Sequence, residues 1–373
     1  MNSPASRPFR KINLALQGGG SHGAFTWGVL DTLLEDGRLD LEGISATSAG
    51  SMNAVILAQG MMAGGPKKGA SHARELLATF WERLSATGNV FAPIQHLAQQ
   101  TPFGNFWQNI QEFWGSADNP AMQALGMMAQ NASPYQFNPL NLNPLRDILG
   151  EMVDFERLQK FKNIQLFITA TNVRTGNPRI FTSHELTCDM ILASAALPNI
   201  FQAVEIDGDA YWDGGFMGNP SLWPLFYECT VPDILIVHVN PLLRHQIPKD
   251  PISIEERLNE ITFNAALLKE LRAISFVQKL LHKDMLKDEH RHKYRDVFLH
   301  AIRVEESLEK LEIGTKFDTS WPFLTSLRDE GRKAAKMWLA KNLDYVGKAA
   351  TIMIDSEYLG APSPAKLEKK NGQ

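Results

Sequence analysis

The sequence contains few cysteines, no long apolar run and no excess of positive charge. Its 373 residues include only Cys188 and Cys229, so neither a disulfide framework nor a cysteine-based zinc site is expected. No stretch approaches the roughly 20 apolar residues that a membrane-spanning helix requires. The formal net charge of -4 argues against a nucleic-acid partner, because such proteins usually present a basic face. These absences favour a cytoplasmic protein, and any contact with a membrane is expected to be peripheral.

The composition is typical of a globular protein, with 44% hydrophobic and 21% charged residues. Strand-like runs alternate with helix-like stretches along most of the chain. Predicted strands cover 11–17, 43–47, 164–171, 179–182, 210–212, 234–239 and 296–302, and predicted helices cover 24–36, 49–59, 72–85, 189–196, 253–286 and 324–343. This alternation predicts an α/β fold with a mixed, mostly parallel central sheet flanked by helices.

Residues 86–145 differ in composition from the rest, being rich in Asn, Gln, Pro, Met, Phe and Trp and poor in Lys and Arg. One interpretation is an insertion that packs its aromatic side chains onto the core. The other is a lid over an apolar site, since methionine and aromatic residues suit adaptable apolar surfaces. We expect residues 10–240 to form the main domain and 250–345 a mainly helical extension packed on it. Residues 1–9 and 360–373 are expected to be flexible tails.

Ser48 lies at a turn between a predicted strand and a predicted helix, in Thr47-Ser48-Ala49-Gly50. This arrangement is typical of a nucleophile elbow, a sharp turn that exposes a serine hydroxyl and requires small neighbours such as Ala49 and Gly50. Ala46 takes the place of the first glycine in the usual G-x-S-x-G pattern. Taken alone, Ser48 is better explained as the N-cap of the following helix.

A second turn, with Gly18, Gly19 and Gly20, follows the first predicted strand. Residues without a Cβ atom allow backbone N–H groups to converge on a small anion, and glycine also permits unusual dihedral angles. In an esterase such a loop forms the oxyanion hole. The alternative is a tight turn from strand to helix that binds no ligand.

The same glycines also satisfy the dinucleotide-binding fingerprint, as Gly18-x-Gly20-x-x-Gly23. That fingerprint requires an acidic residue at the end of the next strand, where it holds a ribose. Asp40 and Glu42 have nearly the required spacing, but they precede the predicted strand at 43–47. A dinucleotide-binding oxidoreductase is therefore a weaker alternative than an acyl-transfer enzyme.

Asp213-Gly214-Gly215 follows the short predicted strand at 210–212. Such a sequence alone is usually a simple turn. A nucleophilic serine requires a base, however, and a carboxylate within hydrogen-bond reach can accept its proton directly. Gly214 and Gly215 would allow the Asp213 carboxylate to approach the elbow without steric obstruction.

Together these motifs resemble those of the patatin-like phospholipase family. The resemblance rests on the segments Gly18–Gly23, Thr47–Gly50 and Asp213–Gly215, and on Ala193–Pro198, which looks like the family's A-S-x-x-x-P segment. It covers roughly residues 12–240. Residues 255–345 more weakly resemble a helical extension found on some larger bacterial members.

The resemblance implies a three-layer α/β sandwich that cleaves acyl esters of lipids through a Ser–Asp dyad. Ser48 would be the nucleophile and Asp213 the general base. Gly19 and Gly20 would be the main oxyanion donors, with Gly18 shaping the loop. The substrates would be phospholipids, lysophospholipids or neutral acyl esters, and neither a metal nor another cofactor would be required.

Two residues depart from the family pattern. Ala46 replaces a glycine at the elbow, and His22 stands where many members carry arginine or lysine near the glycine loop. A catalytically silent lipid-binding protein on the same scaffold is therefore an alternative function. A Ser-His-Asp triad is the commoner arrangement in serine hydrolases, but the resemblance gives neither His184 nor His238 a catalytic role.

Overall fold

The centre of the molecule is a mixed β-sheet. The computed structural model describes residues 9–87, 133–244, 247–249, 251–303, 315–316 and 318–360. Within these residues the sheet has the order β5-β6-β3-β2-β1-β7-β8, and β4 pairs with β3. The strands are β1 (Arg10–Leu16), β2 (Leu39–Ala46), β3 (Gln165–Asn172), β4 (Pro178–Thr182), β5 (Val204–Ile206), β6 (Asp209–Asp213), β7 (Asp233–His238) and β8 (Phe298–Arg303). The β3-β2-β1-β7-β8 neighbours pair in parallel, whereas the pairings of β4, β5 and β6 are antiparallel.

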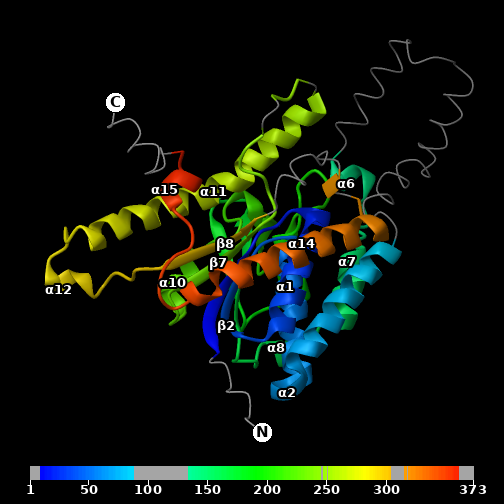
Figure 1. The fold of residues 1–373 in the computed structure, drawn as a ribbon. Coiled ribbons are helices and arrows are strands. Elements are labelled where there is room, and N and C mark those ends of the chain that lie inside the picture. The colour runs from blue at the N-terminus through cyan, green and yellow to red at the C-terminus, as the bar shows by residue number, and fades with distance from the viewer. Residues whose placement is uncertain are drawn as a thin grey trace, which may run out of the picture.

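Helices cover both faces of this sheet (Figure 1). The main helices are α1 (Gly23–Asp36), α2 (Ala49–Ala86), α7 (Pro144–Met152), α9 (Cys188–Ser194), α10 (Trp223–Glu228), α11 (Pro251–His282) and α14 (Trp321–Asn342). The short ones are α6 (Pro134–Phe137), α8 (Phe155–Leu158), α12 (Asp288–Arg291), α15 (Ile354–Glu357), and the 3-10 turns η1 (Gly20–His22), η2 (Gly214–Phe216) and η4 (Leu343–Tyr345).

The alternation of side chains along β1 divides the core into two layers. Leu14 and Leu16 belong to the larger cluster, which α1, α2, α7, α9 and α14 complete. Ala15 points to the other face and belongs to a smaller cluster with side chains of α10, α11 and α15. The predicted α/β architecture, with a mostly parallel sheet between helical layers, is confirmed.

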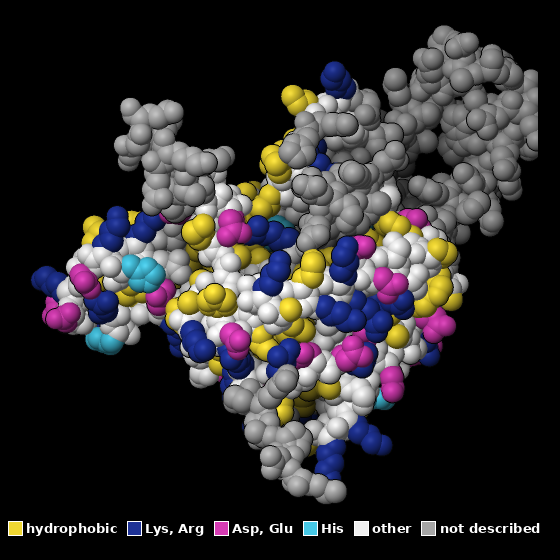
Figure 2. Space-filling view, viewed as in Figure 1, with side chains coloured by type: hydrophobic (Ala, Val, Ile, Leu, Met, Phe, Trp, Pro, Cys, Tyr) yellow, Lys and Arg dark blue, Asp and Glu magenta, His cyan; other side chains and the backbone are white. Residues whose placement is uncertain are grey.

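Charged side chains connect the helices of the larger layer. Asp31 of α1 accepts hydrogen bonds from Arg74 of α2 and Arg332 of α14. Figure 2 shows basic and acidic side chains close together over these helices rather than a single large basic patch on this face. No helix in the described part of the chain is long and apolar enough to cross a membrane.

The structure refines several predicted elements. The predicted helices at 49–59 and 72–85 lie within one element, α2, which is kinked at Gly65, where φ is 61°. The predicted C-terminal extension contributes β8 to the central sheet beside β7. Residues 88–132 lie outside the described residues, and so do nearly all of the two predicted tails, so the interpretations of these segments stay predictions.

The strand register places the ends of β1, β2 and β7 at one edge of the sheet. Leu16 is level with Ala46 of β2 and with Val237 of β7. Ala46 is level with Ile168 of β3, and Asp213 pairs with Ala170, two residues further along that strand. The turns after β1 and β2 therefore meet the end of β6 outside the carboxyl edge, where open α/β sheets commonly bind ligands.

Candidate active site

Ser48 occupies a strained turn between β2 and α2. Its φ of 54° and ψ of -126° are unusual for a residue with a side chain, and its neighbours must hold this conformation. The Ser48 N–H donates to the buried hydroxyl of Ser194, at 2.9 Å. Although Ser48 stands at the N-cap position, its side chain makes no capping hydrogen bond. The hydroxyl is therefore not used to cap α2.

The small residues around Ser48 permit close backbone contacts. A Cβ atom on Gly50 would lie 2.4 Å from the Leu16 carbonyl oxygen, so α2 begins directly against the end of β1. A Cβ atom on Gly18 would lie 2.5 Å from the Cβ of Ser48. Ala46 is fully buried in the larger core cluster, so the turn accommodates a methyl group where the usual pattern has glycine.

Asp213 ends β6 and faces the same turn. Its carboxylate is fully buried, and Oδ1 accepts a hydrogen bond from the Gly215 N–H at 2.7 Å. Among the described residues no group forms a hydrogen bond with Oδ2 by geometry. The Ser48 hydroxyl nevertheless lies close enough to favour the ionised form of the Asp213 carboxylate. Burial raises the pKa of Asp213 to about 7, and the Gly215 and Ser48 contacts oppose this increase. The carboxylate can therefore exchange a proton near neutral pH.

The two glycines after Asp213 let this turn pack tightly. A Cβ atom on Gly214 would lie 2.0 Å from the Thr169 carbonyl oxygen of β3. A Cβ atom on Gly215 would lie 2.9 Å from the ring of Phe263, which belongs to α11. The role expected for Gly214 and Gly215, close approach of the carboxylate to the elbow, is compatible with these contacts.

The glycine loop lies beside Ser48. Gly18 has its N–H occupied, because this group donates to Asn219 Oδ1 at 2.6 Å. Within the described residues no hydrogen bond engages the N–H of Gly19 or Gly20. Gly20 has a φ of 59°, and a Cβ atom there would lie 2.4 Å from the Lys316 carbonyl oxygen. Glycine is thus required at position 20 for both its conformation and its space.

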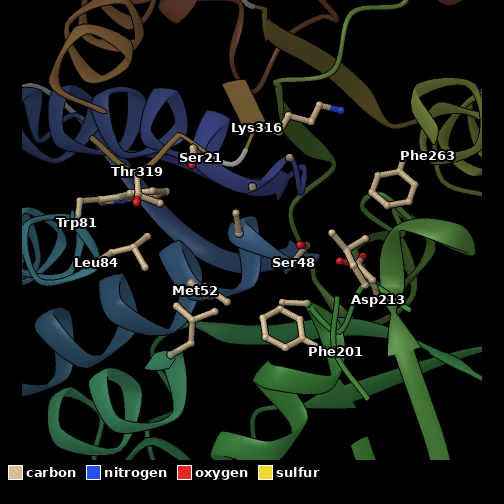
Figure 3. Close-up of a pocket in the computed structure, with 16 residues that line it drawn as sticks. Ser21, Ser48, Met52, Trp81, Leu84, Phe201, Asp213, Phe263, Lys316 and Thr319 are labelled. Atoms are coloured by element: carbon tan, nitrogen blue, oxygen red, sulfur yellow. The ribbon is translucent and has the colours of Figure 1, made fainter. Parts of the chain in front are cut away.

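These groups line one shared pocket. Gly19, Gly20, Ser48 and Asp213 line its polar side, and Figure 3 shows the Ser48 hydroxyl and the Asp213 carboxylate turned toward one another. The remaining wall is mainly apolar and includes Met52, Trp81, Leu84, Leu145, Leu197 and Phe201. No histidine in the described part of the chain lines this pocket, and no cluster of metal-ligating side chains occurs there.

His22 and Lys316 set the charge beside the glycine loop. Burial, followed by the positive charges of Lys316 and Arg244, lowers the pKa of His22 to about 3, so this imidazole is neutral. The His22 Nε2 atom pairs with the Thr315 hydroxyl at 2.9 Å. The positive charge near the loop comes instead from Lys316, whose ammonium group donates to Asn240 Oδ1 at 3.0 Å. Sequence reasoning missed Lys316 because no local pattern connects it with the loop.

The fold and the site together define a serine-containing α/β protein of the patatin type. The sequence model described as Patatin-like phospholipase matches residues 14–226, so the chain belongs to this family, and the resemblance noted from its motifs is confirmed. Among solved structures, VipD from Legionella pneumophila is similar at 14% identity and a TM-score of 0.40, covering 96% of this chain and 75% of VipD. The type III effector ExoU, from Pseudomonas aeruginosa, is similar at 16% identity and a TM-score of 0.35, covering 90% and 54%. No curated protein matches the chain.

Proposed function

We propose that this chain hydrolyses acyl esters of lipids through an acyl-enzyme formed on Ser48. The observation that carries the proposal is that one pocket is lined by the Ser48 hydroxyl, the buried Asp213 carboxylate and the Gly19 and Gly20 backbone. Membership of the patatin-like phospholipase family supports a lipid as the substrate class. The apolar wall, with side chains such as Met52, Leu84 and Phe201, suits an acyl chain.

In the first half of the reaction, Asp213 accepts the proton of Ser48 as the Ser48 oxygen attacks the ester carbonyl carbon. The N–H groups of Gly19 and Gly20 stabilise the oxyanion that forms. Collapse of the tetrahedral intermediate breaks the bond to the alcohol, which leaves with the proton from Asp213. The acyl group then remains on Ser48.

In the second half, Asp213 accepts a proton from a water molecule that attacks the acyl-enzyme. Collapse of this second intermediate returns the proton to the Ser48 oxygen and releases the fatty acid. The hydrogen bonding of Asp213 supports this cycle, because Oδ1 is held by Gly215 while Oδ2 makes no complete hydrogen bond in the described structure. A pKa near 7 allows the carboxylate both to accept and to return a proton at neutral pH.

The alternatives have less support. The dinucleotide interpretation requires an acid at the carboxyl end of β2, but Glu42 lies before that end and accepts hydrogen bonds from Thr230 and Val231. A catalytically silent lipid-binding protein would account for the apolar pocket but not for a strained serine facing a buried carboxylate. A cytoplasmic location and peripheral contact with membranes stay predictions from the sequence.

A serine-reactive fluorophosphonate probe and a panel of p-nitrophenyl esters and phospholipids test the proposal. We expect the probe to label the wild type and the Ser71→Ala variant but not Ser48→Ala, and hydrolysis to follow the same pattern. Ser71 is a matched control, since it belongs to the same helix and is exposed, and its hydroxyl donates to the Lys68 carbonyl of that helix. A folded wild type that neither reacts with the probe nor cleaves any ester would favour the silent alternative.

A further inference from the structure

Four buried amide side chains form one hydrogen-bond network that includes Gly18, and they have no role in the mechanism above. They are Gln17, Asn219, Asn240 and Asn264, with exposed fractions of 0%, 0%, 2% and 4%. They come from four separate places: the end of β1, the loop after η2, the loop after β7, and α11. Buried amides are costly unless their hydrogen bonds are satisfied, so a network of four of them next to this loop requires an explanation.

Two of them hold both polar groups of Gly18. The Gly18 N–H donates to Asn219 Oδ1 at 2.6 Å. The Gly18 carbonyl oxygen accepts from Asn240 Nδ2 at 2.6 Å and from Asn219 Nδ2 at 3.3 Å. The orientation of this carbonyl is therefore fixed from two directions.

The Gly18 carbonyl belongs to the same peptide unit as the Gly19 N–H. A trans peptide is planar, and its C=O and N–H point in opposite directions. Fixing the carbonyl against Asn219 and Asn240 consequently directs the Gly19 N–H away from them. The next peptide unit is held similarly, because the Gly19 carbonyl accepts from the His22 N–H at 3.2 Å and the Gly20 N–H is on its opposite side.

Asn240 is itself held in one orientation. Its Oδ1 accepts from the Lys316 ammonium group at 3.0 Å, which leaves its Nδ2 to face Gly18. Its backbone N–H donates to Gln17 Oε1 at 3.0 Å. Hydrogen bonds to a charged group are strong and polarise the bonds that follow them in a chain. The series from Lys316 through Asn240 to the Gly18 carbonyl therefore strengthens the Gly19 N–H as a donor.

We infer that Asn219 and Asn240 are positioning residues that aim the Gly19 N–H at the oxyanion. The inference rests on the proposed function, because it assumes that an oxyanion forms next to Ser48. An interaction made only with the transition state affects kcat rather than KM. Loss of either amide should thus slow acylation without weakening substrate binding.

The test compares Asn219→Leu and Asn240→Leu with Asn13→Leu, using a short-chain p-nitrophenyl ester and the fluorophosphonate probe. Asn13 is an equally buried amide on β1, but its Nδ2 donates to Val231, away from the loop. Removing one oxyanion donor typically costs about 10²–10³ in kcat, so misdirecting one should cost about 10- to 100-fold. We expect this loss in kcat and in labelling rate for positions 219 and 240, with KM unchanged, and neither loss for Asn13→Leu.

Folded variants at 219 and 240 with kcat within about threefold of the wild type, or with a change in KM alone, would overturn the inference. If the leucine variants do not fold, Asn219→Ser and Asn240→Ser give a smaller perturbation with the same measurements. A wild type that neither hydrolyses esters nor reacts with the probe would instead overturn the proposed function, and this inference with it.

Discussion

Replacement of Asp213 by asparagine should make the protein inactive and, above neutral pH, more stable. Burial raises the pKa of Asp213 from 3.8 to about 7. That difference corresponds to about 4 kcal/mol between the protonation states, so the ionised form destabilises the fold by roughly this amount. Asparagine keeps the shape and the oxygen that accepts from Gly215, but it carries no charge and cannot take a proton from Ser48. Activity should fall by about 10²–10⁴-fold, the contribution of a general base.

The sign of the stability effect depends on pH. A carboxyl group with a raised pKa in the folded state binds its proton more tightly there than in the unfolded chain, so its contribution to stability decreases as pH rises from about 4 to about 7. Above about pH 7 the penalty is constant. Between pH 5 and pH 8 the advantage of Asp213→Asn over the wild type should therefore grow by about 2–3 kcal/mol. The cost of the unpartnered amide N–H is the same at both pH values and cancels.

Urea unfolding at pH 5 and pH 8, together with turnover of a p-nitrophenyl ester, measures both effects. Asp344→Asn is a suitable control for the loss of one carboxylate, because that carboxylate is 90% exposed whereas Asp213 is fully buried. An advantage of Asp213→Asn that is equal at the two pH values would contradict the argument from burial. Near-normal turnover of the same variant would show that another group is the base.

Three further predictions concern the same region. The wild-type kcat/KM should rise with pH and level off above an apparent pKa of about 7, that of Asp213, and an inflection near 4 in a pH–rate profile would contradict this. Ser48→Gly should be inactive yet more stable by about 1 kcal/mol, because glycine relieves the positive φ, and a lower unfolding midpoint in urea would argue against stored strain. Burial also raises the pKa of Glu270 to about 7, opposed by the N–H groups of Leu222 and Trp223, so its contribution to stability decreases as pH rises toward 7. The stability of Glu270→Gln relative to the wild type, measured by urea unfolding, should accordingly be greater at pH 8 than at pH 5, and kcat should be unchanged. An equal stability difference at the two pH values would refute this.

The elements that carry the elbow and the glycine loop could be predicted because their signals are local. The glycine loop and Ser48 each follow a short apolar strand directly, and β1 and β2 are parallel neighbours in the sheet. The carboxyl ends of parallel neighbours meet at the same edge, so the proximity of Gly18 to Ser48 follows from topology alone. Asp213 is different, since it ends an antiparallel strand on the far side of β3. The hydrophobic periodicity of the sequence did not indicate that Asp213 lies near Ser48, whereas the family resemblance did.

The residues that surround the loop could not be predicted in this way. Asn219 is 201 positions from Gly18, and Lys316 is 76 positions from Asn240. Each lies in a connecting segment where no repeating pattern of apolar residues indicates which side chain turns inward. An asparagine in a loop is usually a turn residue. Asn219 and Asn240 can bind the Gly18 backbone only because the tertiary structure buries them beside it. Interactions of this kind depend on tertiary structure and are invisible to local reasoning.

The charge at the glycine loop illustrates how one such interaction compensates for a departure in sequence. His22 stands where many family members carry a permanent cation, which suggests a site without one. In the folded protein Lys316 lines the pocket, and its charge helps to lower the pKa of His22. Burial alone disfavours protonation of His22, and a cation there would also lie close to that of Lys316, so the imidazole stays neutral. The loop thus keeps a positively charged residue nearby, although Lys316 comes from a distant segment of the chain. Lys316 donates to Asn240, and Asn240 donates to the carbonyl of the peptide unit that carries the Gly19 N–H.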